Sequence, residues 1–166
     1  MDVIPAIDLM NGRVVRLLKG DPKTAKKYDY LGQPVEIAKR WEKEGANNLH
    51  IIDLDAVLTM GANLETISRI VREVNIPIQV GGGIRRIDAA ENLLEMGVDR
   101  VILGSLAFNE PRALVQLREN FGKQRLIVAL DHKDGKIMVD GWKTSTEFGI
   151  EAALQGFLDL EIETFL

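Results

Sequence analysis

The feature that most constrains this chain is an alternation of short apolar runs with segments of helical periodicity. The apolar runs are rich in Val, Ile and Leu and lack polar alternation, which is typical of strands covered on both faces. From the second run onward they start about 25–35 residues apart, the usual length of a strand–helix repeat, and no linker interrupts them. The pattern predicts a single α/β domain over residues 1–166 with a parallel sheet and right-handed crossovers. The predicted strands are residues 3–7, 49–52, 76–80, 101–103, 126–130 and 162–166.

The segments between these runs predict amphipathic helices, because apolar residues recur on one face of each. Pro34 and Pro111 stand where a helix would begin, and Gly45 and Gly97 where one would end. Trp41 is interpreted as plain core. The remaining residues on the three apolar faces are Ile37 and Ala38; Leu64, Ile67, Ile70, Val71 and Val74; and Ile150, Ala153, Leu154, Phe157 and Leu158.

Two architectures compete for such a sheet. A doubly wound fold commonly carries a G-x-G-x-x-G fingerprint after its first strand, and the residues around Asp8 and Gly12 lack it. Polar residues or glycines instead follow nearly every predicted strand, which favours a (β/α)₈ barrel with chemistry at the carboxyl ends of its strands. The chain would then contain about the first five βα units and a sixth strand. The residues in question are Asp8, Asp53, Gly81, Gly104 and Asp131.

An internal repeat supports the barrel. Residues 4–13 and 127–136 match in Ile, Ala, Asp, Gly and a final basic residue, with one offset of 123 positions for Asp8 and Asp131 (131 − 8) and for Gly12 and Gly135 (135 − 12). An offset of that size is close to half of a barrel of about 250 residues. The repeat halves would start near residues 1 and 124, and strands one and five would face each other across the barrel mouth.

Asp8 and Asp131 are the candidate catalytic residues. Each follows an apolar strand, where burial raises the pKa of a carboxyl group that is neither paired nor solvated. Opposed across one pocket, one could be protonated and the other ionised, which suits a general acid and a general base. The alternative is that each aspartate only caps a turn completed by Gly12 or Gly135.

Two glycine motifs are candidate phosphate sites. The run from Gly81 to Gly83 precedes Arg85 and a predicted helix, and Gly104 with Ser105 follows the next strand. Glycines let backbone N–H groups approach an oxyanion, and an arginine supplies charge. In the alternative interpretation, both motifs are tight turns.

Three further residues could contact a substrate. Arg16 could meet a second anionic group or be a solvated charge, and Trp142 could stack on a flat heterocycle or cover an edge of the core. His50 could point into the barrel or be a core histidine whose ring nitrogens are hydrogen-bonded within the protein.

Composition excludes several classes of function. The chain has no cysteine and only two histidines, His50 and His132, without ligand-like spacing, so no metal site is expected. A net charge of −4 without basic blocks argues against nucleic-acid binding. The first residues do not resemble a signal peptide, and no apolar run reaches the ~20 residues of a membrane span. A cytoplasmic protein is expected.

Together these motifs resemble the phosphoribosylformimino-5-aminoimidazole carboxamide ribotide isomerase family of histidine biosynthesis, over essentially the whole chain. The sister cyclase family, which makes imidazole glycerol phosphate, usually begins differently and carries a lysine where this chain has Arg16, so the isomerase is preferred. The matching stretches are IPAIDL (4–9), GRVVRL (12–17), HIIDLDA (50–56), QVGGGIR (79–85), VILGS (101–105), ALD (129–131) and GW (141–142).

The resemblance implies an Amadori aldose-to-ketose rearrangement of a ribonucleotide with phosphates at both ends. By carry-over, Asp8 is the base that removes the proton next to the imine, and Asp131 is the acid that helps to open the ribose ring. No cofactor or metal is implied, because the imine nitrogen of the substrate accepts the electron pair. One phosphate would be held by Gly82, Gly83, Arg85, Gly104 and Ser105.

Family members continue for roughly another quarter to a third of a barrel. The 166 residues alone are therefore expected to be inactive or very weak, and their exposed strand edges to favour self-association or a complementing C-terminal chain. Two alternatives stay open: a cyclase-like subunit, and a non-catalytic half-barrel that binds phosphate.

Overall fold

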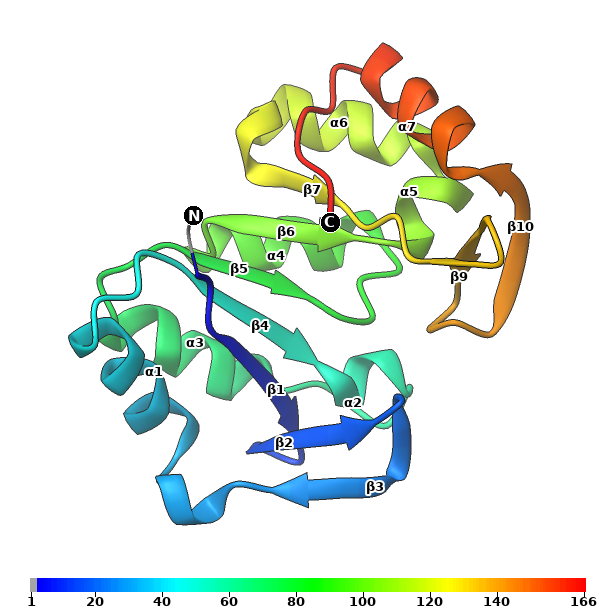
Figure 1. The fold of residues 1–166 in the computed structure, drawn as a ribbon. Coiled ribbons are helices and arrows are strands. Elements are labelled where there is room, and N and C mark those ends of the chain that lie inside the picture. The colour runs from blue at the N-terminus through cyan, green and yellow to red at the C-terminus, as the bar shows by residue number, and fades with distance from the viewer. Residues whose placement is uncertain (1–2) are drawn as a thin grey trace. The chain divides into compact units, whose positions relative to one another are not determined.

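The computed structural model describes residues 3–166 and divides into two compact units, one ending at Gly82 and one running from Gly83 to Leu166 (Figure 1). Each unit alternates strands with helices, and its central strands pair in parallel. The predicted α/β alternation with parallel pairing is therefore confirmed. The single domain and the repeat halves expected from the sequence stay predictions.

The first unit contains a sheet in the order β3-β2-β1-β4-β5. The central strands β1 (Ala6–Met10), β4 (Leu49–Asp53) and β5 (Ile78–Gly81) are parallel, whereas β2 (Arg13–Leu18) and β3 (Asp21–Lys27) extend the sheet in antiparallel fashion. The helices of this unit are α1 (Pro34–Lys43), α2 (Leu54–Val57) and α3 (Leu64–Glu73), with a 3₁₀ turn at Asp29–Leu31.

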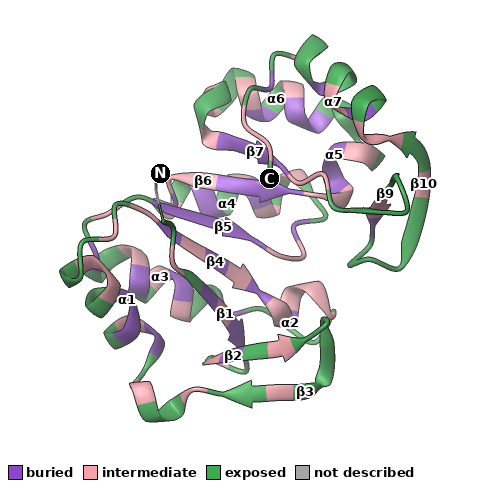
Figure 2. Ribbon diagram, in the orientation of Figure 1, coloured by how far each residue is buried: buried purple, intermediate pink, exposed green. Residues whose placement is uncertain are grey.

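The core of the first unit lies between the sheet and the helices α1 and α3 (Figure 2). Side chains alternate across a strand, so Ile7 and Leu9 of β1 share the helix-facing side with their neighbours on β4 and β5, and all are buried. Pro34 begins α1 as predicted, and the Gln33 N–H donates to the Glu36 carboxylate at 2.7 Å, which satisfies one free amide of the helix start. Trp41 is half-buried, and its interpretation as core stays a prediction.

The second unit contains the parallel pair β6 (Arg100–Leu103) and β7 (Leu126–Val128) and a three-stranded antiparallel sheet. That sheet has the order β10-β9-β8, from β8 (His132–Lys133), β9 (Lys136–Val139) and β10 (Thr144–Gly149). The helices are α4 (Ile87–Glu95), α5 (Ser105–Asn109), α6 (Pro111–Phe121) and α7 (Ile150–Asp159), with a 3₁₀ turn at Lys123–Arg125.

The predicted strand bounds were wrong at both ends of the chain. Strand β1 spans Ala6–Met10 rather than residues 3–7, because Asp8, Leu9 and Met10 pair with β2 in a hairpin. The strand expected at 162–166 is reduced to one parallel bridge between Phe165 and Val128. The antiparallel strands β3, β8 and β10 do not stand out in the sequence, because they are mostly polar and exposed.

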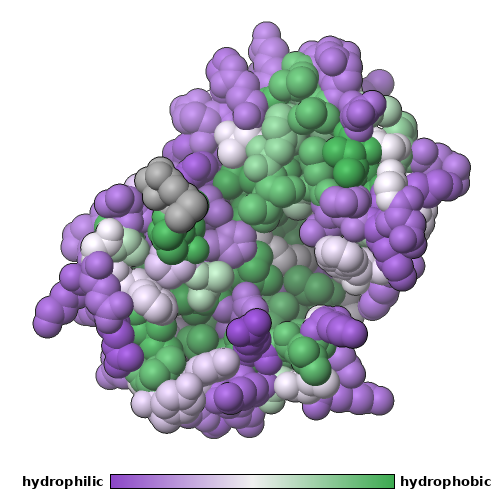
Figure 3. Space-filling view, viewed as in Figure 1, coloured by the Kyte–Doolittle hydropathy of each residue, from purple (hydrophilic) through white to green (hydrophobic). Residues whose placement is uncertain are grey.

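Both units leave apolar surface visible on the face seen in Figure 3. The exposed large apolar side chains of the described residues include Leu18, Phe148 and Leu166. No helix among residues 3–166 is long and apolar enough to cross a membrane.

The structure shows why a glycine is needed at position 82. Gly82 has φ +100°, and a Cβ there would lie 2.6 Å from the carbonyl oxygen of Asp53 and 2.9 Å from its nitrogen. Both obstacles are backbone atoms, which cannot rotate away. Gly20 has a similar φ of +73°, but nothing lies within 4 Å of the position that a Cβ would take there.

We predict that Gly82→Ala lowers the free energy of unfolding by about 2–4 kcal/mol, because left-handed strain and an overpacked backbone contact add. Gly20→Ala carries only the strain and is expected to cost about 1 kcal/mol. Urea denaturation midpoints of the purified chain measure both. Equal losses for the two variants would contradict the role of the Asp53 contact.

Candidate functional site

The face of the first unit's sheet opposite α1 and α3 carries the polar residues of the candidate site. In the register between β1 and β4, Ala6 pairs with His50 and Asp8 with Ile52. His50 pairs in turn with Gln79 of β5. Because side chains alternate, Asp8, His50 and Gln79 project from one face, away from the helix-covered side.

Asp8 lies inside strand β1 and is half-buried, rather than in a turn after the strand. Burial raises the pKa of the Asp8 carboxyl group, and the charge of Arg16 on β2 partly opposes this rise. Arg16 itself is exposed. The hairpin thus places a base of raised proton affinity near one cationic group, which suits an acid–base role at neutral pH.

His50 is bonded to a neighbouring side chain. Its Nδ1 lies 2.8 Å from Nε2 of Gln79, which is buried. The amide can only donate through Nε2, so Nδ1 accepts and the ring proton is on Nε2. Burial lowers the pKa of His50, so a neutral imidazole is favoured. The ring is therefore held by a partner, and its Nε2–H remains a donor on the face shared with Asp8.

The loop after β5 turns sharply at two glycines. Gly82 and Gly83 both have positive φ, at +100° and +66°, and Arg85 is exposed with its guanidinium directed to the Gly83 carbonyl at 3.5 Å. The helix α4 begins only at Ile87, and the Ala89 N–H is already bonded to the Asp88 carboxylate at 2.9 Å. The backbone of the loop itself, rather than that helix amide, is what an anion could contact.

The second glycine motif has a different environment. Gly104 has φ −97°, and nothing lies within 4 Å of a Cβ built there. Packing therefore does not require a glycine at this position. Ser105 accepts a hydrogen bond from the Asp140 N–H at 2.7 Å, which ties α5 to the end of β9 and leaves the hydroxyl proton free to donate elsewhere.

Asp131 follows β7 after two residues and precedes β8. The residue as a whole is exposed, but partial burial of its carboxyl group raises its pKa, against the opposing charge of His132.

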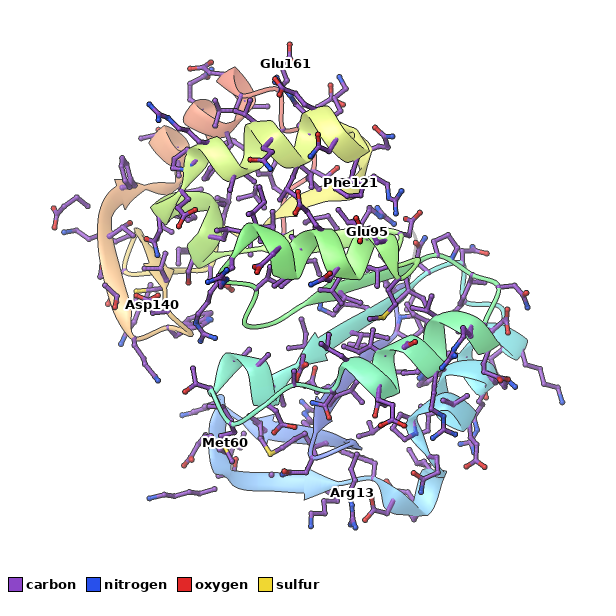
Figure 4. All side chains as sticks on the ribbon, turned by 180° about the vertical axis from the view of Figure 1, so that it is seen from behind. Arg13, Met60, Glu95, Phe121, Asp140 and Glu161 are labelled. Carbon is purple, nitrogen blue, oxygen red and sulfur yellow. The ribbon has the colours of Figure 1, made fainter. Side chains whose placement is uncertain are left out.

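Trp142 lies between β9 and β10, is 57% exposed and has φ +68°. Whether this indole stacks on a heterocycle or covers an edge of the core stays a prediction. Figure 4 marks the start of this turn at Asp140.

The predicted site residues fall into two groups. Asp8, Arg16, His50 and Gly82 belong to the first unit. The second unit contains Gly83, Arg85, Gly104, Ser105, Asp131 and Trp142.

Sequence reasoning missed two sets of polar residues. Gln79 lies inside an apolar run of the sequence, and a polar residue inside such a run is itself a signal. Asp55 and Asn63 are buried together with Asp53, the last residue of β4. The sequence Asp53-Leu54-Asp55 directly after a strand was the available clue. Among residues 3–166 no group of three or more histidines or carboxylates is arranged to hold a metal ion.

Comparison with known proteins decides the family. A family model described as "Histidine biosynthesis protein" matches residues 2–166. The chain belongs to this family. The predicted fold class, a partial (β/α)₈ barrel, is the fold of the family and is confirmed.

Three relatives illustrate the similarity. The chain is 47% identical to one from Cenarchaeum symbiosum over 166 residues, which are all of this chain and 70% of the relative. It is 45% identical over 147 residues to one from Methanocaldococcus jannaschii, covering 89% of this chain and 61% of the relative. A relative from Halothermothrix orenii is 40% identical over 167 residues, covering all of this chain and 70% of its own length.

The names of all three describe an isomerase of an imidazole-4-carboxamide that carries phosphoribosyl groups. The resemblance to the isomerase branch of the family is therefore confirmed. The chain spans between 61% and 70% of the length of these relatives.

The environment of Asp8 has a consequence for stability. A raised pKa means that the ionised carboxylate destabilises the folded state relative to the unfolded chain. This cost is absent at a pH below the ordinary aspartate value, grows as pH rises through the raised pKa, and is fully present above it. We predict that Asp8→Asn raises the urea midpoint at pH 7 and that the gain shrinks as the pH is lowered towards about 4.

Asp29→Asn is the matched control, because it removes an exposed carboxylate that contacts Arg13 of the same hairpin at 2.8 Å. It is expected to give no such gain. A lower midpoint for Asp8→Asn than for the unsubstituted chain at pH 7 would show that Asp8 stabilises the fold instead.

Proposed function

We propose that the protein to which these residues belong catalyses an aldose-to-ketose (Amadori) isomerisation of phosphoribosylformimino aminoimidazole carboxamide ribonucleotide in histidine biosynthesis. The observation that carries the proposal is that the relatives are named as this isomerase and that the chain has two carboxyl groups suited to its acid–base chemistry. The relatives named as this isomerase match the chain at 40–47% identity, and Asp8 and Asp131 both have raised pKa values.

The chemistry requires one proton to be added and another to be removed. Asp131, protonated, donates to the ring oxygen of the ribose as the ring opens and the C1–nitrogen bond becomes an imine. Asp8, ionised, then removes the proton from C2. The C2–H electron pair forms a C1=C2 double bond and the C1=N pair moves onto nitrogen, which gives an enaminol. Tautomerisation to the C2 ketone returns a proton to C1, so the sugar is isomerised with no net gain or loss of electrons.

The environments of the two carboxyl groups support these roles. A general acid at neutral pH needs a pKa above the ordinary aspartate range, and partial burial shifts the pKa of Asp131 in that direction. A base is more effective when its proton affinity is raised, as burial does for Asp8. Arg16 limits that rise and keeps Asp8 more readily ionised.

One phosphate of the substrate is assigned to the glycine loops. Gly82 and Gly83 turn the backbone after β5, and Arg85 adds a positive charge beside them. Gly104 leaves open space over its backbone, and the Ser105 hydroxyl keeps a proton to donate. Together the open backbone, the hydroxyl proton and the arginine supply the hydrogen-bond donors and the positive charge that bind a phosphate.

Three residues are assigned to the rest of the substrate. Arg16 is exposed and could meet the second phosphate or another anionic group. Trp142 offers an exposed indole for stacking on the imidazole. His50 offers its Nε2–H as a neutral donor on the face shared with Asp8.

The acid–base roles can be tested in a completed barrel, in which residues 1–166 are joined to the remaining segment of the Cenarchaeum symbiosum relative. We predict that Asp8→Asn and Asp131→Asn each lower kcat by at least about 10²-fold, the usual scale for an acid–base group. Chromatographic conversion of the aldose to the ketose measures the rate. In the unsubstituted protein kcat/KM should fall as pH drops through the raised pKa of Asp8.

Asp29→Asn again serves as the control and should retain the rate. If both aspartate variants keep full turnover, the proposed roles are wrong. If the completed barrel binds inorganic phosphate but turns over no aldose in any form, the non-catalytic alternative gains support.

The phosphate assignment gives a separate prediction. Gly104→Ala should add no packing clash, because nothing lies within 4 Å of the position that a Cβ would take there. It should raise KM by about tenfold, the effect of weakening one hydrogen bond to a charged group. Steady-state kinetics and urea midpoints of the same samples measure the two effects. An unchanged KM would place the phosphate elsewhere.

The predicted partner is a bisphosphorylated small molecule, in line with the relatives' names. Self-association or a complementing chain at the strand edges, and a cytoplasmic location, stay predictions.

A further inference from the structure

The hairpin that carries Asp8 is held at its tip by buried side chains. Strands β1 and β2 are joined by Asn11 and Gly12, whose φ values of +52° and +69° are those of a tight two-residue hairpin turn. The Asn11 N–H donates to the Asp55 carboxylate at 2.6 Å, and the Gly12 N–H donates to Oδ1 of Asn63 at 2.8 Å. Both amides of the turn are therefore bonded to side chains more than forty positions away.

These side chains belong to one network, which we call the anchor cluster: Asp53, Asp55 and Asn63. All three are at most 5% exposed. The Asn63 amide donates to Asp53 at 2.7 Å and to Asp55 at 2.9 Å, and the Asn63 N–H donates to Asp53 at 2.7 Å. Asp53 also accepts from the Ala56 N–H at 3.1 Å, at the start of α2.

The anchor cluster also touches the glycine loop. The backbone of Asp53 is the surface against which Gly82 packs, so closely that a Cβ would not fit. A continuous series of contacts therefore runs from the loop after β5, through the end of β4, to the turn after β1. Figure 4 shows the α2–α3 connection, labelled at Met60, beside the hairpin labelled at Arg13.

One feature of the cluster is unfavourable for stability. Oδ1 of Asp55 is buried and has no hydrogen-bond partner among the described residues. A buried acceptor without a partner destabilises a fold, and an apolar residue would avoid this. The other oxygen, Oδ2, accepts the 2.6 Å bond from the Asn11 N–H. The cluster is thus suited to holding the turn firmly rather than to maximal stability.

The second unit supplies an internal comparison. The turn between β8 and β9 has the same local form, with Asp134 and Gly135 at φ +52° and +79°. Both residues are exposed, and no described side chain bonds to either turn amide. Hairpin geometry alone therefore does not require such an anchor. Of these two hairpins, the one that carries Asp8 has it.

We propose that Asp55 and Asn63 are positioning residues. They hold the β1–β2 hairpin so that the distance between the Asp8 carboxylate and the Arg16 guanidinium stays fixed. This inference rests on the proposed role of Asp8 as the base. Asp8 pairs with Val15, the residue before Arg16, so any slip or twist of β2 changes the distance between the carboxylate and the guanidinium. Bonding both turn amides to side chains of the anchor cluster opposes that movement.

The first experiment tests the anchor without reference to catalysis. Amide hydrogen exchange in the completed barrel should show Asn63→Ala accelerating exchange at Gly12 by about tenfold or more, and Asp55→Ala doing so at Asn11. Asp55→Asn keeps an oxygen that can accept from Asn11 and should stay within about threefold of the unsubstituted protein. Unchanged exchange at both turn amides in the two alanine variants would overturn the proposal.

The second experiment tests the consequence for Asp8. Asn63→Ala and Asp55→Ala should lower kcat by about 10- to 10²-fold with little change in KM, because small displacements of a catalytic group cost that much. The acid limb of the pH profile should move to higher pH, because the opposing charge of Arg16 acts less on Asp8. Asp55→Asn should restore most of kcat. Asn63→Ala keeps the bonds of Asp53 and Asp55 to backbone amides, so it covers the case in which Asp55→Ala does not fold.

Asp29→Ala is the matched control, since it removes an exposed contact of the same hairpin and should change neither exchange nor kcat. A lower unfolding midpoint with unchanged kcat and pH profile would make the anchor cluster merely structural and would overturn the proposal while leaving the isomerase role intact. Full activity in Asp8→Asn would instead remove the proposed base, and with it the function on which this inference rests.

Discussion

The parallel register between β1 and β4 is the constraint on which the first unit depends. Pairing Asp8 with Ile52 and Leu9 with Asp53 sends Ile7, Leu9 and Ile51 towards the helices, where they are fully buried. The same register leaves Asp8 and His50 on the opposite face. A slip of one residue would exchange the two faces and bury a carboxylate among apolar side chains. Burial of the apolar set therefore also determines where the chemistry is placed.

Glycines in the two loops after β5 and β6 serve different physical purposes. Gly82 is explained by packing, because its α-carbon faces the backbone of Asp53 and its φ is left-handed. Nothing lies within 4 Å of a Cβ built on Gly104, so packing gives no reason for a glycine there. Glycines that follow strands therefore do not all have the same explanation. The position that packing leaves unexplained is the better candidate for a close approach by a ligand.

Much of the fold could be predicted, because buried parallel strands and amphipathic helices leave periodic apolar patterns. The helix starts at Pro34 and Pro111 and the parallel central strands followed from such patterns. Strands β3, β8 and β10 could not be predicted in the same way, since these exposed, mostly polar strands are held by hydrogen bonds across turns to a neighbouring strand. For the same reason the end of β1 was misplaced, and Asp8 lies within a strand rather than after it.

The sequence by itself determined the fold class, the family and the identity of the polar residues near strand ends, because each of these is written in local spacing and residue type. Tertiary structure alone decided which partners those residues have. Asp55 and Asn63 meet the turn at Asn11 and Gly12, and Gln79 meets His50, across separations of about thirty to fifty positions. Such contacts depend on strand register and burial, and no local pattern records them.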